Sequence, residues 1–172
     1  LHKIDNSKIM LKYKNYYDYE LGKRWLKKFK KHGIEPSRII LLAHNSVGPD
    51  HLAFYNQIDI ALDPFPFNGA TSTFESLLMG VPVISLNGET FVSRVSSTIL
   101  KQCKQDEFVC DSYDNYILNA IRASQLTKNG RIKREKIRQM LLNSPLLNHD
   151  EYAKQVEAAY LDIWKNLTLK LK

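Results

Sequence analysis

The sequence contains few cysteines and no recognisable set of metal ligands. Cys103 and Cys110 are its only cysteines, and they form neither the paired spacing of a zinc site nor a Cys-x-x-Cys motif. No Asp-x-Asp pair occurs, and the five histidines are scattered without ligand spacing. These absences predict a metal-free site. Two isolated thiols are typical of buried free cysteines in a reducing compartment, and we expect a cytoplasmic protein.

Long apolar runs are also missing. No stretch approaches the roughly 20 apolar residues that cross a bilayer, and no signal-peptide pattern opens the chain, so we expect no membrane partner. The chain begins with Leu1 rather than methionine, which favours a piece of a longer protein. Hydrophobic residues make up 44% and charged residues 25% of the chain, as in globular proteins. The length of 172 residues predicts a single domain over residues 1–172.

Acidic residues are outnumbered, and the net charge is +7. Much of the positive charge lies in residues 23–31, where apolar residues recur at helical spacing. This pattern predicts an amphipathic helix whose basic face is solvated. Binding of nucleic acid to this face is the less favoured alternative, and it predicts an affinity that falls steeply with salt.

Short apolar runs alternate with amphipathic stretches along the chain. This order predicts an α/β fold with a Rossmann-like, doubly wound parallel sheet and right-handed crossovers. The last amphipathic stretch, residues 150–167, carries aromatic residues at helical spacing that belong to a core or an interface. The strands are expected at residues 8–13, 38–42, 58–62, 82–86 and 108–110.

The most informative stretch is residues 58–86, which reads as strand, loop, helix and strand. Its helix opens with small and hydroxyl-bearing residues, from Ala70 to Thr73. A helix N-terminus carries unpaired N–H groups and partial positive charge, so such residues let an anion come close. The competing interpretation is a capping box, in which Ser72 caps the helix and Glu75 reaches back to it. Its place after a strand favours a ligand site, because open α/β sheets bind ligands there.

The run LDPFPFNGATSTFESLLMGVPVISLNGETFVSRV, residues 62–95, resembles the catalytic signature of the O-linked N-acetylglucosamine transferase family in its bacterial branch. The resemblance extends to the strand at residues 9–13 and to the Pro-Asp-His helix start at residues 49–51. It also includes Ser144-Pro145 and the aromatic helix that follows, so it covers nearly the whole chain.

This resemblance implies the C-terminal, nucleotide-binding half of a GT-B glycosyltransferase catalytic region. It implies inverting, metal-independent transfer of N-acetylglucosamine or a related hexose from UDP to a protein acceptor. The UDP-sugar is the donor substrate, and no further cofactor is implied. The implied partners are the acceptor, an N-terminal catalytic half and upstream tetratricopeptide repeats. The helix at 150–167 would then pack back on its own domain or toward that half.

The resemblance also assigns site residues. Thr71 and Ser72 would bind the diphosphate and stabilise it as it leaves, and Glu75 would accept hydrogen bonds from the ribose. By position alone His51 reads as a half-exposed surface histidine, but the resemblance places it against uracil or ribose. Arg94 either reaches a phosphate or braces the loops through a carboxylate. The complete predicted donor site is His51, Asn68, Gly69, Ala70, Thr71, Ser72, Glu75 and Arg94.

Two positions depart from the animal members of the family. Ala70 stands where those enzymes have a histidine, and Gly48 stands where they have a lysine. A polar contact and a cation near the diphosphate are therefore absent, which leaves a glucose-class donor open. The alternative function is a nucleotide-binding or protein-interaction module that has no turnover of its own.

Overall fold

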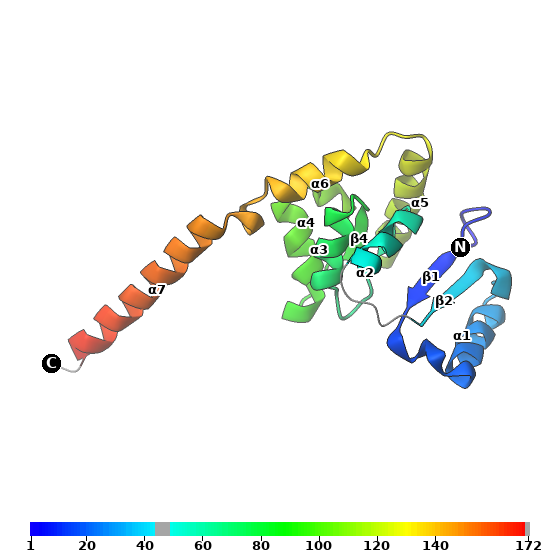
Figure 1. Ribbon diagram of the computed structural model, residues 1–172, viewed down its shortest axis with the longest axis horizontal. Coiled ribbons are helices and arrows are strands. Elements are labelled where there is room, and N and C mark those ends of the chain that lie inside the picture. The colour runs from blue at the N-terminus through cyan, green and yellow to red at the C-terminus, as the bar shows by residue number, and fades with distance from the viewer. Residues whose placement is uncertain (44–48, 171–172) are drawn as a thin grey trace. The chain divides into compact units, whose positions relative to one another are not determined.

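The computed structural model describes residues 1–43 and 49–170 (Figure 1). The chain divides into two compact units, Leu1–Phe54 and Tyr55–Lys172. Every strand pair in both units is parallel, and helices connect the strands, which confirms the predicted α/β class. The expectation of one domain over residues 1–172 stays a prediction.

The first unit is built on two parallel strands. Strand β1 (Ile9–Lys12) pairs with β2 (Ile39–Leu42), so that Lys12 lies opposite Leu42 at the carboxyl ends of both. Helix α1 (Tyr19–Lys31) packs on β2. A Cβ atom built at Gly22 of this helix would lie 3.5 Å from a methyl group of Leu41. The remaining elements of this unit are the 3₁₀ helices η1 (Lys14–Tyr17) and η2 (Pro36–Arg38), and α2 (Pro49–Ala53); η3 (Phe54–Gln57) starts at its last residue and belongs mainly to the second unit.

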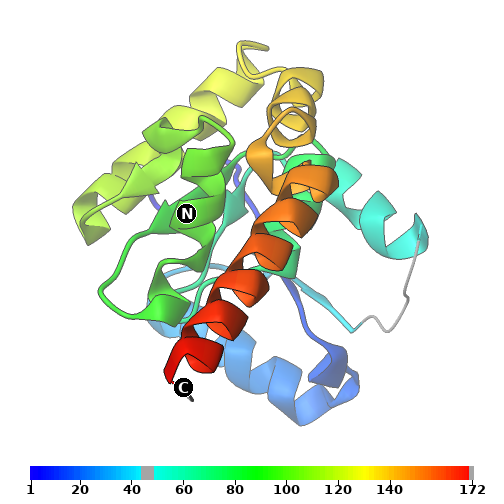
Figure 2. The ribbon, with the colours of Figure 1, turned by 90° about the vertical axis from the view of Figure 1, so that its left-hand side faces the viewer.

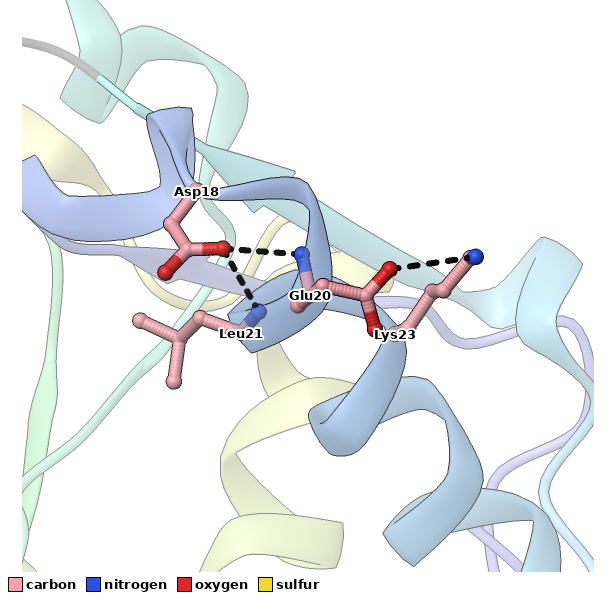
Figure 3. A network of polar contacts seen from close by, with 4 residues as sticks. All are labelled: Asp18, Glu20, Leu21 and Lys23. Carbon is pink, nitrogen blue, oxygen red and sulfur yellow. Dashed lines mark hydrogen bonds and ion pairs between the residues drawn. The ribbon is translucent and has the colours of Figure 1, made fainter.

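Helix α1 begins at a well-formed cap. Asp18 accepts hydrogen bonds from the backbone N–H groups of Glu20 and Leu21 at 2.8 and 3.2 Å, and Lys23 pairs with Glu20 at 3.3 Å (Figure 3). Both carboxylates lie at the positive end of the helix, which stabilises them. The apolar side of α1 is half-buried and its lysines are exposed, which confirms the predicted amphipathic helix.

The second unit contains a three-stranded parallel sheet in the order β3-β4-β5. Its buried apolar core forms around β4, with Leu77, Ile84 and Leu100 fully buried. The strands are β3 (Ala61–Leu62), β4 (Val83–Leu86) and β5 (Val109–Cys110). The helices are α3 (Thr71–Leu78), η4 (Phe91–Ser93), α4 (Val95–Gln102), η5 (Asp106–Phe108), α5 (Tyr113–Lys128), α6 (Arg134–Leu142) and η6 (Pro145–Leu147).

Two elements have boundaries that their apolar patterns do not explain. Strand β3 is shorter than the expected residues 58–62, because the Arg134 guanidinium binds the carbonyl groups of Tyr55 and Ile58. The helical segment after β4 is interrupted at Arg94: a capping box between Thr90 and Ser93 forms the short η4, and α4 starts only after Arg94. In both places, contacts outside the apolar pattern set the boundary.

Helix α7 (His149–Lys170) runs as one continuous helix (Figures 1 and 2). Its aromatic side chains are largely exposed, with Tyr160 at 70% and Trp164 at 67%. Exposed apolar residues at this density mark a surface that another element can cover. No helix in the described residues 1–43 and 49–170 is long and apolar enough to cross a membrane.

Candidate functional site

The loop between β3 and α3 is organised by a buried carboxylate. Asp63 follows β3 and is 4% exposed. Its Oδ1 accepts a hydrogen bond from the backbone N–H of Gly69 at 2.8 Å, and its Oδ2 accepts one from the Ser85 hydroxyl at 2.7 Å. Tyr116 donates to the Asp63 carbonyl at 2.9 Å. Asp63 therefore fixes the path of the chain into α3 through both its carboxylate and its backbone carbonyl.

A second set of contacts brings the start of α4 to the start of α3. The Ser96 hydroxyl donates to the Gly69 carbonyl at 2.6 Å, and Thr73 Oγ1 lies 2.8 Å from Ser96 Oγ. The Asn68 N–H donates to the Val92 carbonyl at 3.0 Å. Residues 68–69 are thus held between the two helices that follow neighbouring parallel strands, at the edge where α/β proteins bind ligands.

A side chain at Gly69 would require the Ser72 hydroxyl to rotate away. A Cβ atom built there would lie 2.3 Å from Ser72 Oγ and 3.2 Å from Thr73 Oγ1. This close approach explains a glycine at this position without any unusual backbone angle. It also shows that the Ser72 hydroxyl lies directly against the loop backbone.

The N-terminus of α3 has no side-chain cap. Ala70 is the N-cap residue, and Thr71 and Ser72 are exposed in the first turn. The predicted capping box between Ser72 and Glu75 is not formed, because the helix begins at Thr71 with Ala70 as its N-cap; Glu75 Oε2 accepts a hydrogen bond from the Tyr55 hydroxyl at 2.9 Å. Thr71 and Ser72 thus lie exposed at the positive end of the helix, which favours an anion there.

Burial shifts the pKa values of groups around this loop. Desolvation raises the pKa of Asp63, and the hydrogen bonds from Gly69 and Ser85 oppose that rise. Desolvation and the neighbouring Glu75 raise the pKa of Tyr55 well above its usual value. Tyr55 therefore keeps its proton at neutral pH, and its hydroxyl donates a hydrogen bond to the Glu75 carboxylate.

The Asp63 network gives a first prediction. Replacing Asp63 by alanine should lower the free energy of unfolding by roughly 2–4 kcal/mol, because the buried Gly69 N–H and Ser85 hydroxyl lose their acceptor. Asp63→Asn keeps an acceptor oxygen and should cost less than about 1 kcal/mol. Urea unfolding monitored by circular dichroism measures both, and equal losses in the two variants would contradict the assigned role.

The raised pKa of Asp63 also sets the sign of a pH effect. The folded state holds this proton more tightly than the unfolded state. Its stabilising effect is therefore present at low pH and is lost as pH rises from the unfolded value, about 4, through the folded pKa. Measured against Asp63→Asn, the wild-type chain should lose stability as pH rises through that range; a gain would contradict the prediction.

The other predicted residues of the second unit differ in their roles. Asn68 is 3% exposed, and its amide donates to the Pro64 carbonyl at 3.1 Å, so it shapes the loop. Arg94 is exposed, and its guanidinium forms no hydrogen bond or ion pair within residues 1–43 and 49–170. In the described residues no carboxylate pairs with Arg94, and the interpretation of Arg94 as a loop brace stays a prediction. Its contact with a phosphate stays a prediction.

His51 belongs to the first unit. It is half-buried on α2, which agrees with the half-exposed histidine expected from position alone, and its Nδ1 lies 2.7 Å from Lys12 Nζ. Gly48 lies outside the described residues. A hollow of about 470 Å³ at the exit of β1 is lined by Lys14, Asn15, Tyr17 and Asp18, and none of the predicted site residues lines it.

The structure adds polar residues that the sequence analysis did not assign. Asp63, which directly follows the strand predicted at residues 58–62, received no role from the sequence, although it organises the whole loop. The sequence signal for its partner is Ser85, a lone hydroxyl within the apolar run of β4. Ser96 and Tyr116 carry no comparable signal. In the described part of the chain, no group of three or more His, Cys, Asp or Glu residues is placed to hold a metal ion.

Comparisons with known proteins identify the family. The model of glycosyl transferase family 41 matches residues 3–156. The probable UDP-N-acetylglucosamine–peptide N-acetylglucosaminyltransferase SPINDLY of Solanum lycopersicum is 31% identical over 166 residues, 96% of this chain and 18% of that protein. SPINDLY of Arabidopsis thaliana is 31% identical over 163 residues, with 94% and 18% coverage. The chain therefore spans less than a fifth of these curated relatives.

A solved structure agrees with these relatives. A mutant of the Thermobaculum terrenum O-GlcNAc transferase superposes with a TM-score of 0.83 at 29% identity, over 92% of this chain and 30% of that one. This likeness confirms the predicted Rossmann-like α/β fold of a GT-B C-terminal domain. The resemblance to the O-linked N-acetylglucosamine transferases, inferred from residues 62–95 and their surroundings, is confirmed with it. The chain belongs to glycosyl transferase family 41.

Proposed function

We propose that this chain is the donor-binding domain of a glycosyltransferase that moves N-acetylglucosamine or a related hexose from UDP to a protein acceptor, in the cytoplasm. The proposed reaction inverts the sugar and needs neither a metal nor a further cofactor. The observation that carries the proposal is the uncapped N-terminus of α3, with Thr71 and Ser72 exposed in its first turn. The names of the curated and solved relatives support a UDP-sugar as the donor.

The proposed chemistry is stabilisation of the leaving group. As the glycosidic bond breaks, the diphosphate gains negative charge, so donors aimed at it bind the transition state more strongly than the ground state. The first-turn N–H groups and the hydroxyls of Thr71 and Ser72 take this role. Gly69 and Ala70 allow the phosphates to approach the backbone, and Arg94 adds a cation next to the same loop.

The proposed nucleoside contacts come from Glu75 and His51. Glu75 accepts hydrogen bonds from the ribose hydroxyls, and Tyr55 orients its carboxylate from the buried side. His51 contacts uracil or ribose. Asn68 acts on the site indirectly, because its amide and its backbone N–H hold the loop that leads into α3.

The remaining parts of the enzyme are proposed to lie outside this chain. Because the chain covers 18% of its first curated relative, we place the acceptor site and any general base on an N-terminal catalytic half, preceded by tetratricopeptide repeats. The exposed aromatic side of α7, with Tyr160 and Trp164, is the surface proposed to pack against that half. The competing function is a nucleotide-binding or protein-interaction module without turnover, which the same exposed helix also suits.

Calorimetric titration of the chain with UDP tests the donor site. The double variant Thr71→Ala/Ser72→Ala should weaken UDP binding at least tenfold, because two hydrogen bonds to a charged group are lost. Ser124→Ala/Thr168→Ala is the matched control, since those hydroxyls bond only carbonyls of their own helices. The control should bind UDP like the wild-type chain, and excess chelator should leave the affinity unchanged. Failure of the wild-type chain to bind UDP would favour the interaction module.

A further inference from the structure

Lys12 is the last residue of β1 and received no role from the sequence. It is half-buried and lies opposite Leu42 in the parallel register. Its side chain therefore starts at the carboxyl edge of the strands, where open α/β sheets bind their ligands.

Two residues of the α2–η3 segment hold the Lys12 ammonium group. Its Nζ lies 2.7 Å from Nδ1 of His51 and 5.0 Å from the centre of the Phe54 ring. The three residues belong to the same unit of the chain. A hydrogen bond to one partner and a cation–π contact with the other fix the position of the ammonium group.

The chemistry of an ammonium group determines the state of the imidazole ring. An ammonium carries three N–H donors and no acceptor, so Nδ1 of His51 must accept the hydrogen bond. A neutral imidazole that accepts at Nδ1 carries its hydrogen on Nε2. A doubly protonated ring would present a donor at both nitrogens and would leave Lys12 without this contact.

We propose that Lys12 is a positioning residue that holds His51 as its Nε2–H tautomer, so that His51 recognises a nucleotide as a hydrogen-bond donor. The clause on the nucleotide rests on the proposed function, whereas the tautomer does not. A donor at Nε2 selects an oxygen acceptor: a pyrimidine carbonyl, a ribose hydroxyl or a phosphate oxygen. It cannot pair with an N–H or amino group of the ligand.

Long-range ¹H–¹⁵N spectra of the labelled chain at about pH 8.5, where imidazole rings are neutral, read the tautomer directly. His51 should show the Nε2–H pattern, with its signals assigned by their loss in His51→Gln. His2 is an internal reference, because its Nε2 lies 2.7 Å from the His32 carbonyl, which can only accept. A wild-type His51 spectrum of the Nδ1–H form would overturn the inference, whether or not any variant folds.

Variants of Lys12 separate positioning from general structure. Lys12→Met should shift the His51 signals toward a mixture of tautomers, whereas Lys12→Arg, which keeps N–H donors, should retain the Nε2–H form. Lys14→Met, which removes an exposed lysine two residues along, is the control. An unchanged His51 spectrum in a folded Lys12→Met chain would also overturn the inference.

UDP titration of the same proteins tests the nucleotide clause. Lys12→Met should weaken UDP binding roughly fivefold to tenfold, the effect of losing one oriented hydrogen bond, and Lys12→Arg and Lys14→Met should stay within about twofold of the wild-type chain. Equal UDP affinity in Lys12→Met and wild type would refute the nucleotide clause. If the tautomer is Nε2–H and no protein binds UDP, the proposed function fails and the role of Lys12 toward His51 stands.

Discussion

Replacing Gly80 by alanine should lower the free energy of unfolding by about 3–5 kcal/mol, a large part of a typical domain's stability. Gly80 has φ +71°, in the left-handed region where a side chain is strained. An added Cβ would also lie 2.5 Å from both Cβ and the carbonyl oxygen of Arg134, and 2.7 Å from its carbonyl carbon. Backbone atoms cannot rotate away, so α6 would have to move from the end of α3.

Movement of α6 would also break a set of partly buried polar contacts. The Arg134 guanidinium donates to the Met79 carbonyl at 3.2 Å and to the Tyr55 carbonyl at 3.1 Å, and it binds the Ile58 carbonyl as well. The carbonyls at the C-terminus of a helix carry partial negative charge and favour such a cation. Gly80 thus allows the close approach through which Arg134 joins α3, η3 and the entry to β3.

Urea unfolding measures this loss, and Gly130→Ala is its matched control. Gly130 has φ +65°, but a Cβ there would meet only the Lys133 ammonium nitrogen at 3.6 Å. The control isolates backbone strain and should cost about 1–2 kcal/mol. Equal losses for the two variants would show that Arg134 does not resist the added methyl group.

Local patterns of the sequence predicted the order of elements and the position of the α3 turn. Apolar runs and helical spacing depend on residues within one element, and the structure has a strand or helix wherever they predicted one. The exposed first turn of α3 followed from small and hydroxyl residues placed directly after a strand. The same local pattern also suggested a capping box between Ser72 and Glu75, which the structure does not contain. Glu75 instead accepts a hydrogen bond from Tyr55, twenty residues earlier.

The contacts that position the site lie beyond the reach of local patterns. Asp63 binds Ser85 across 22 residues and Tyr116 across 53. Strand β3 is short because the Arg134 guanidinium, 76 residues further along the chain, donates to the Ile58 carbonyl. In each case a polar side chain forms a hydrogen bond with a distant backbone or hydroxyl group. The spacing of apolar residues carries no information about such pairs. Lys12 was read only as a strand residue for the same reason.

Replacing Ser72 by aspartate should change stability and ligand binding in opposite directions. Ser72 is the second residue of α3, where a carboxylate interacts favourably with the helix dipole, so unfolding should cost up to about 1 kcal/mol more. The same carboxylate would face the proposed diphosphate. Two unit charges about 4 Å apart near a protein surface interact by about 4 kcal/mol, so UDP binding should fall at least about a hundredfold.

Asn148→Asp is the control for net charge. Asn148 caps the start of α7, where its side-chain oxygen accepts the Glu151 N–H at 3.1 Å, and the change adds one negative charge as Ser72→Asp does. Because exposed charges are screened beyond roughly 10 Å in 0.1 M salt, this variant should bind UDP within about twofold of the wild-type chain. Retained UDP binding in Ser72→Asp would show that the diphosphate does not bind at α3. Equal weakening in both variants would show that the effect comes from the overall charge. Loss in Ser72→Asp alone, in a chain at least as stable as the wild type, places the phosphates at the first turn of α3.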